Sequence, residues 1–209
     1  MDDPSLFARL KKGISLQQNL ARDVPAFLNQ HGFPHTAAHA HQVALKARWL
    51  AGIYGVDQRA AETAGWLHDI SAVIPNEQRL PVSQQLGLEI LAEEARFPML
   101  LHQKISARMA EEIFGVHQPE VLQAIECHTT LRANPGPLDL VLFVADKIAW
   151  DQPGEPPYLE AVLRALPTSL QSAALVYIDF LWERKDQLAG PLHPWFLAAR
   201  RQLHSGETP

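Results

Sequence analysis

Apolar residues recur at helical spacing along almost the whole chain, and this pattern constrains the fold more than any other feature. The strict alternation of apolar and polar residues that is typical of half-buried strands is almost absent. Between residues 37 and 54, for example, Ala47 and Leu50 share one stripe, and Gly55 follows as a helix stop. Asp57 is then suited to be the N-cap of the next helix. We therefore predict an all-α fold.

The other apolar segments predict a series of further helices. We expect them at residues 23–30, from 58 toward 75, and at 82–94, 102–115, 119–131, 138–150, 158–166, 169–186 and 194–203. The Pro-rich segment 151–157 is the clearest linker. The chain has 209 residues, of which 47% are hydrophobic, and this is enough for one sizeable core. We therefore treat residues 1–209 as a single domain.

Composition and charge limit the classes of function. The formal net charge is -5. A protein whose main function is to bind nucleic acid needs excess Lys and Arg on one face, so this charge argues against that class. The single cysteine, Cys127, cannot form an intramolecular disulfide, which suits a reducing compartment, and we expect it to be buried and inert. No apolar stretch approaches the roughly 20 residues of a membrane span. We expect a cytoplasmic protein that binds neither membrane nor nucleic acid.

Strongly polar residues interrupt the inward apolar stripes of several predicted helices. They are His39, His68, Asp69, His102, His128 and Asp146. An uncompensated charge in an apolar interior costs several kcal/mol, so these groups need partners. Taken singly, each histidine fits a hydrogen-bonded core residue as well as a ligand. Four imidazoles and two carboxylates directed at one core together predict a site for divalent metal ions.

The other histidines do not share this pattern. His41 projects away from the stripe of His39, and the whole group is expected at the surface: His31, His35, His41, His117, His193 and His204. Of these, His35 is the best candidate for a further site residue because it is near His39. Two tryptophans, Trp49 and Trp66, are expected in the core.

Five ordered segments carry a resemblance to a known family: HAHQVALKARWLAGIYGVD, WLHDI, the LH at 101–102, CHTT at 127–130 and FVADKI at 143–148. In this order they resemble the HD-domain metal-dependent phosphohydrolases, and more narrowly the YqeK-type branch of symmetrical bis(5'-nucleosyl)-tetraphosphatases. The resemblance spans about residues 34–151. It implies an HD-domain helical bundle with an N-terminal helical extension, about 1–33, and additional C-terminal helices, about 158–205.

The resemblance also implies roles for the six polar residues. Matched by position, His39, His68, Asp69 and Asp146 would bind a first metal ion. His102 and His128 would bind a second, with Asp69 bridging the two ions. Iron is the first expectation for both ions and manganese the alternative. His68 and Asp69 are the expected catalytic residues, and a hydroxide held by the metal ions would attack phosphorus.

Residues near the ligands in sequence are candidates for binding the substrate. They are Lys104, Thr129, Thr130, Arg132 and Lys147. The cations could stabilise a leaving group, and the hydroxyls could donate to a phosphate. Relatives of this branch carry a lysine where this chain has Ala72 and a glycine where it has Gln103. These departures bear on the substrate more than on the metal.

Three functions therefore stay open. The first is cleavage of diadenosine tetraphosphate into two ADP. The second is hydrolysis of a mononucleotide or another small phosphoester by a phosphatase or pyrophosphatase. The third is a non-catalytic, metal-stabilised module that binds a nucleotide. A nuclease is disfavoured by the acidic balance and by the lack of a basic-aromatic stripe. A homodimer is compatible with the additional C-terminal helices.

Overall fold

The computed structural model of the chain describes residues 6–150 and 152–206, and within these ranges every regular element is helical. The α-helices are α1 (Leu6–Leu10), α2 (Leu20–Gln30), α3 (Pro34–Tyr54), α4 (Gln58–Leu67), α5 (Asn76–Gln85), α6 (Ala92–Arg96), α7 (His102–Glu112), α8 (Pro119–Cys127), α9 (Pro137–Ile148), α10 (Leu159–Ala165), α11 (Leu170–Glu183) and α12 (Pro194–Ser205). Short 3-10 helices are η1 (Ile70–Val73), η2 (Pro98–Leu101) and η3 (Lys185–Gln187). The all-α prediction is confirmed. None of the described helices is long and apolar enough to cross a membrane.

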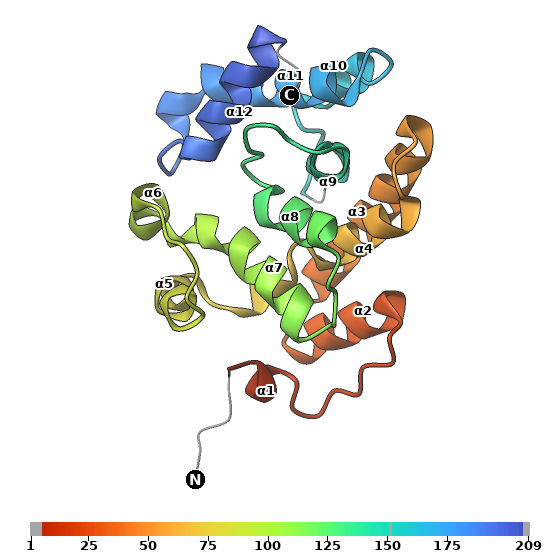
Figure 1. Cartoon of the computed structure of the whole chain (residues 1–209), viewed down its shortest axis with the longest axis vertical. Coiled ribbons are helices and arrows are strands. Elements are labelled where there is room, and N and C mark those ends of the chain that lie inside the picture. Colours follow the sequence, from red (N-terminus) through yellow and green to blue (C-terminus); the bar gives the residue numbers. More distant parts are fainter. Residues whose placement is uncertain (1–5, 151, 207–209) are drawn as a thin grey trace.

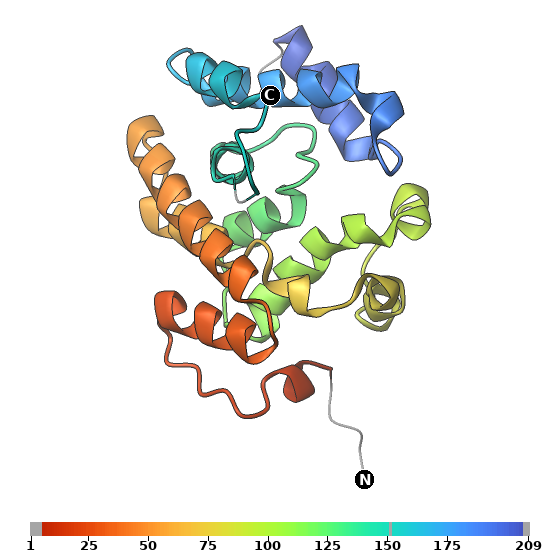
Figure 2. The same cartoon turned by 180° about the vertical axis from the view of Figure 1, so that it is seen from behind.

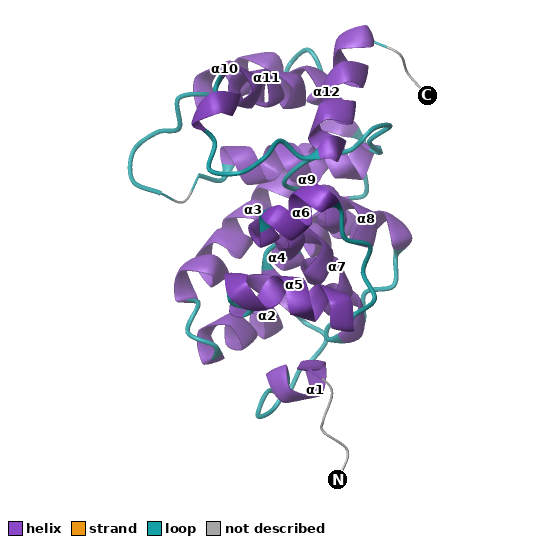
Figure 3. Ribbon diagram, turned by 90° about the vertical axis from the view of Figure 1, so that its left-hand side faces the viewer, coloured by secondary structure: helices purple, strands orange, loops and turns teal. Residues whose placement is uncertain are grey.

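The helices pack around α9, which runs through the middle of the molecule (Figures 1 and 2). On one side α9 packs against α3, α4 and α8, and α8 packs in turn against α7. On the other side α10 and α11 cover α9, and α12 packs on α11, so that these three helices form a layer above it (Figure 3). Buried apolar residues from α2 to α12 belong to one continuous core. The expected N-terminal extension and C-terminal helices therefore share that core. Residues 1–5 of the extension and Asp151, the last residue of the expected HD core, lie outside the described residues.

Helices α3 and α4 approach each other unusually closely. A Cβ atom added to Gly65 would lie 2.6 Å from the Cα of Ala44 and 2.7 Å from its backbone nitrogen. Both helices present small, fully buried residues at this contact, including Ala47 and Ala61. The close approach brings the N-terminal half of α3 beside the C-terminal end of α4, where His68 follows.

A buried charge network joins the start of α12 to α6 and α7. The carboxylate of Glu94 accepts a hydrogen bond from the Lys104 ammonium at 2.9 Å and one from His193 Nε2 at 3.2 Å. His193 Nδ1 accepts from the backbone N–H of Trp195 at 3.1 Å, which leaves Nε2 to carry the proton. The Lys104 ammonium lies over the Trp195 ring, 4.8 Å from its centroid. His193 is thus 2% exposed, and the prediction of a surface histidine was wrong.

Several boundaries and positions differ from the prediction. The single helix expected at 82–94 is broken, because Gly87 adopts a left-handed conformation, with φ of +64°, just after α5 ends. Trp49 is 50% exposed, since it lies with Leu45 and Ile53 on the outward face of α3, so its prediction as a core residue was wrong. Trp66 and Cys127 are buried as expected, and Asp57 caps α4 through hydrogen bonds from two backbone N–H groups. The homodimer stays a prediction.

The α3–α4 contact predicts the effect of adding one methyl group. Gly65→Ala forces a Cβ into the backbone of Ala44, and we expect the free energy of unfolding to fall by about 1–3 kcal/mol. Urea denaturation measures this. The matched control is Gly52→Ala in α3, whose Cβ would meet only the exposed side chain of Gln58 and which gains helix propensity. Equal stabilities of the two variants would contradict the close packing.

The Glu94 network predicts a loss of stability that depends on pH. Burial raises the pKa of Glu94, but the hydrogen bonds from His193, from the Leu91 backbone and from Lys104 outweigh burial and leave the pKa below its usual range. The ionised carboxylate therefore stabilises the fold above that range, and the stabilisation is lost as the pH falls through the lowered pKa. Glu94→Gln leaves the Lys104 charge uncompensated, so we expect a loss of about 3 kcal/mol at neutral pH.

Chemical denaturation of wild type and Glu94→Gln at neutral and at acidic pH tests this prediction. The difference between the two proteins should shrink as the pH falls. Glu160→Gln is the matched control, because Glu160 is exposed and pairs only with the exposed Arg164 one helical turn away. A difference that is the same at both pH values would show that the charge of Glu94 is not the stabilising feature.

Candidate metal centre

Five segments of the chain bring the six predicted ligands together. His39 lies on α3, His68 and Asp69 follow the end of α4, His102 begins α7, His128 follows α8, and Asp146 lies in the last turn of α9. These elements pack on one another in the middle of the molecule (Figure 1). These six residues, which come from segments far apart in the sequence, thus form one cluster in space, which we call the His-Asp cluster.

Two carboxylates connect the four imidazoles of the His-Asp cluster. Asp146 Oδ1 lies 3.1 Å from His39 Nε2 and 3.5 Å from His68 Nε2. Asp69 Oδ2 lies 3.5 Å from His68 Nε2. Its other oxygen, Oδ1, lies 3.5 Å from the Nε2 atoms of both His102 and His128. His68 therefore faces both carboxylates, and Asp69 faces three imidazoles.

Backbone carbonyls fix the tautomers of three of these histidines. In His68, His102 and His128, Nδ1 lies 2.8, 2.7 and 2.8 Å from the carbonyl oxygen of the residue three positions earlier. A carbonyl can only accept, so Nδ1 carries the proton and Nε2 presents its lone pair to the cluster. Each of these carbonyls lies in the last turn of a helix, and those of Met99 and Ile125 also accept the backbone N–H of the same histidine. This arrangement is the usual one for metal-ligating histidines.

The unprotonated nitrogens call for a cation. The Nε2 atoms of His102 and His128 are 3.1 Å apart, and with both protons on Nδ1 no hydrogen bond can form between them. Two nitrogens bound to one ion at ordinary metal–nitrogen distances lie about 3 Å apart. His68 Nε2 is buried and has no hydrogen-bond partner in the part of the chain that the structure describes. Bound divalent ions would satisfy these atoms.

Two overlapping sets of three ligand atoms are close enough to hold an ion. One set is His39, His68 and Asp146, and the other is His68, Asp69 and His128; within each set the ligand atoms lie within 4.8 Å of one another. Imidazole nitrogens with carboxylate oxygens suit iron, manganese and zinc. The residues present therefore fit the expected divalent metal ions.

The electrostatics of the cluster follow from burial and close charges. Burial raises the pKa of Asp69, but His68 and the other imidazoles lower it far more, so the carboxylate stays ionised. Burial likewise raises the pKa of Asp146, and Lys147 and the histidines bring it well below its usual range. Burial lowers the pKa of His68, yet the two carboxylates raise it to about 9, so a metal ion bound at Nε2 would displace a proton from that nitrogen. Burial dominates at His102, whose pKa falls to about 4 although Asp69 opposes the shift.

The cluster is most exposed to solvent at Asp69, and we call this its open side. His68 and His128 are 1% and 2% exposed, whereas the side chain of Asp69 is 31% exposed. His102 lies beside Asp69 and is partly exposed. A substrate would therefore reach the cluster from the side of Asp69 and His102.

Two of the five candidate substrate residues lie beside the cluster. Thr129 Oγ1 is 3.0 Å from His102 Nε2. The Lys147 ammonium lies 2.5 Å from Asp146 Oδ2, and it also lies over the rings of Phe143 and Tyr177. Lys147 is 8% exposed, so it mainly holds Asp146 in place.

The other three candidates have partners elsewhere. Lys104 belongs to the Glu94 network, because a position two residues after His102 faces another side of α7. Arg132 forms an ion pair with Asp139 at 2.8 Å. Thr130 is buried and bonds to Gln103 at 3.2 Å. Closeness in sequence to a ligand did not bring these three side chains to the cluster.

The sequence analysis missed one cation at the open side, Arg79 of α5. Its Nε donates to the carbonyl of Ile74 at 3.3 Å, and its Nη1 donates to the carbonyl of Met99 at 3.2 Å. Met99 is also the residue whose carbonyl accepts from His102 Nδ1. Burial lowers the pKa of Arg79, and the nearby carboxylate of Asp69 opposes that shift.

The expected helix through the HD pair ends earlier than predicted. Helix α4 stops at Leu67, and His68 is its C-cap, while α8 stops at Cys127 with His128 as C-cap. The two histidines therefore sit at helix ends and not within inward helical stripes. Such a position lets each ring reach the carbonyl of its own last turn.

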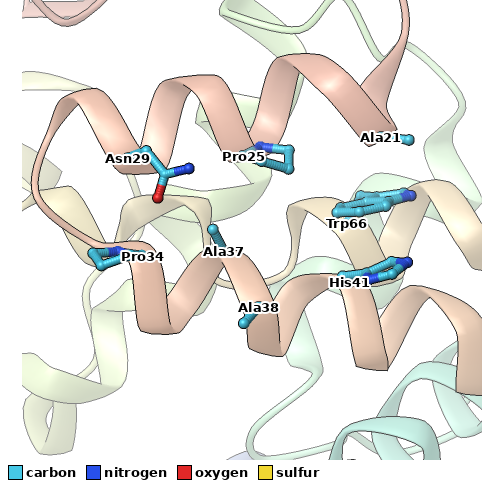
Figure 4. Close-up of a pocket in the computed structure, with 8 residues that line it drawn as sticks. All are labelled: Ala21, Pro25, Asn29, Pro34, Ala37, Ala38, His41 and Trp66. Atoms are coloured by element: carbon cyan, nitrogen blue, oxygen red, sulfur yellow. The ribbon is translucent and has the colours of Figure 1, made fainter.

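A separate cleft of about 320 Å³ lies between α2 and α3, on another side of α3 (Figure 4). There the rings of His41 and Trp66 stack with centroids 5.2 Å apart. None of the six cluster residues lines this cleft. His41 thus points away from the cluster, as its offset from His39 along α3 predicted.

Comparison with known proteins gives consistent results. The model of the HD domain family matches residues 36–151. An uncharacterized protein in the pepC 5' region of Lactococcus lactis subsp. cremoris is 45% identical over 150 residues, 72% of this chain and 75% of that protein. A symmetrical bis(5'-nucleosyl)-tetraphosphatase of Halalkalibacterium halodurans is 32% identical over 184 residues, 86% and 92% of the two chains.

A solved structure is similar over almost the whole chain. It is the crystal structure of a predicted HD superfamily hydrolase involved in NAD metabolism from Clostridium acetobutylicum. The TM-score is 0.81 at 29% sequence identity, and the match covers 93% of this chain and 100% of that one. The similarity therefore extends to the helices on both sides of the cluster.

The geometry predicts that Asp69 is required for metal binding. Asp69→Ala removes the carboxylate that faces three imidazoles, so we expect the bound metal to fall well below the wild-type level while the far-UV circular dichroism stays the same. Elemental analysis of the purified variant measures this. Asp186→Ala is the control, because Asp186 is 90% exposed and pairs only with Lys185. Wild-type metal content in Asp69→Ala would contradict the assignment.

Proposed function

Because this chain belongs to the HD domain family of hydrolases, we propose that it is a metal-dependent phosphohydrolase that cleaves diadenosine tetraphosphate symmetrically. One water is consumed, the bond between the two middle phosphates breaks, and two ADP are released. The observation that carries the proposal is the His-Asp cluster, with three imidazoles oriented by carbonyls so that Nε2 faces two ionised carboxylates. The relatives named as symmetrical tetraphosphatases support the choice of substrate.

The cluster would hold two divalent ions, iron or alternatively manganese. His39, His68, Asp69 and Asp146 would bind the first ion, and His102 and His128, with Asp69 as the bridge, would bind the second. When bound, such ions lower the pKa of water and withdraw charge from phosphoryl oxygens. The sharing of His68 between two close sets of ligand atoms supports two adjacent positions.

The residues of the chain itself would position ligands and substrate. Lys147 holds Asp146, and the carbonyl of Met99 holds His102. The hydroxyl of Thr129 donates to His102 Nε2 at 3.0 Å, and with that nitrogen bound to an ion the hydroxyl would be free to donate to a phosphoryl oxygen. His68 and Asp69 are the catalytic pair of this proposal, since together they contact every other member of the cluster. The buried, single Cys127 supports a reducing, cytoplasmic compartment.

A second candidate is a phosphatase or pyrophosphatase that acts on a mononucleotide or another small phosphoester. It is supported by the cations that turn away from the cluster, since Lys104 and Arg132 are engaged with Glu94 and Asp139. Ala72 also replaces a lysine of the tetraphosphatase branch. A long polyphosphate needs more positive charge than a single phosphate. A non-catalytic nucleotide-binding module ranks last, because all six ligands are present.

Elemental analysis combined with product identification tests the proposed function. We expect stoichiometric iron or manganese in the purified protein and two ADP from each diadenosine tetraphosphate. Release of AMP and ATP would contradict symmetrical cleavage. Turnover restricted to mononucleotides or other phosphoesters would replace the first candidate by the second. Asp69→Ala should lose all turnover, and Asp186→Ala should retain it.

A further inference from the structure

We propose that Arg79 binds a phosphate group of the substrate at the open side of the His-Asp cluster. This inference rests on the proposed function, because it takes the substrate to be a nucleotide or another phosphoester. Arg79 lies in the first turns of α5, which follows η1 and the His68-Asp69 pair. No feature of the sequence distinguished it from the other arginines.

The guanidinium is held in place by two backbone carbonyls. Nε donates to Ile74 and Nη1 donates to Met99, so the planar group has a fixed orientation. The Met99 carbonyl also accepts from His102 Nδ1 at 2.7 Å. Arg79 and His102 therefore share one acceptor, which places the guanidinium on the Nδ1 side of the His102 ring and near enough to Asp69 for their charges to interact.

The remaining donors of Arg79 have no protein acceptor. Within the described ranges, Nη2 makes no hydrogen bond, and no carboxylate lies within ion-pair distance of the guanidinium. The side chain is half-buried and lies near the exposed edge formed by Asp69 and His102. A half-buried cation with unused donors is suited to an anionic ligand, and a guanidinium can bind two oxygens of one phosphate.

The other cations near the cluster already have carboxylate partners. Lys147 pairs with Asp146, Lys104 with Glu94, and Arg132 with Asp139. Arg79 differs from all three because its partners are neutral carbonyls. Its full positive charge is thus available to a ligand.

The test compares Arg79→Gln and Arg79→Lys with wild type, all loaded with metal. Isothermal titration calorimetry measures the Kd for ADP and for inorganic pyrophosphate. We expect Arg79→Gln to weaken both by about tenfold or more, because one charged hydrogen-bonding partner is lost. Arg79→Lys should be intermediate, since it keeps the charge and loses the planar fork. Arg164→Gln, at an exposed position of α10, should bind like wild type.

Metal content and thermal unfolding of the same samples separate binding from structure. Weakened binding at wild-type metal content supports the inference. Unchanged affinity in Arg79→Gln would overturn it, and so would loss of metal from both Arg79 variants, because Arg79 would then act only by holding Met99 and His102. If wild type fails to cleave diadenosine tetraphosphate but Arg79 still governs pyrophosphate affinity, only the proposed function fails.

Discussion

The carbonyls at helix ends orient the candidate metal centre, and most of the site depends on them. Each of His68, His102 and His128 donates its Nδ1 proton to the residue three positions earlier. Each carbonyl lies in the last turn of a helix, so the position at which the helix ends also fixes the orientation of the ring. If Nδ1 were unprotonated, Nε2 would carry the proton and could not bind a metal ion. The helix boundaries are therefore part of the chemistry of the site.

The same cluster ties the C-terminal helices to the candidate site. Asp146 is ionised and largely buried, and Lys147 compensates its charge at 2.5 Å. Burial lowers the pKa of Lys147, but Asp146 outweighs burial, so the ammonium stays charged. That ammonium lies against the ring of Tyr177 in α11. The layer formed by α10, α11 and α12 thus shields the ion pair of Lys147 and Asp146 from water. A core that ended near residue 151 would leave this ion pair exposed to solvent.

The sequence allowed the six residues of the His-Asp cluster to be singled out, because each is a polar residue in an apolar, helical pattern. It did not allow the directions of Lys104, Thr130 and Arg132 to be predicted. Those directions depend on partners brought by the fold, such as Glu94, which itself contacts His193 from a distant part of the chain. The ends of α4 and α8 were also missed, because His68 and His128 continue the helical periodicity although they cap the helices.

The break in the helix expected at 82–94 explains how Arg79 reaches the cluster. A continuous helix would carry the chain away from α5 in a straight line. The left-handed Gly87 and the irregular segment before α6 instead let the chain turn back, so that α5 packs against η2. This contact brings Arg79 to the carbonyl of Met99, and Met99 immediately precedes the turn that presents His102. The turn at Gly87 thereby helps to place the Arg79 guanidinium next to His102.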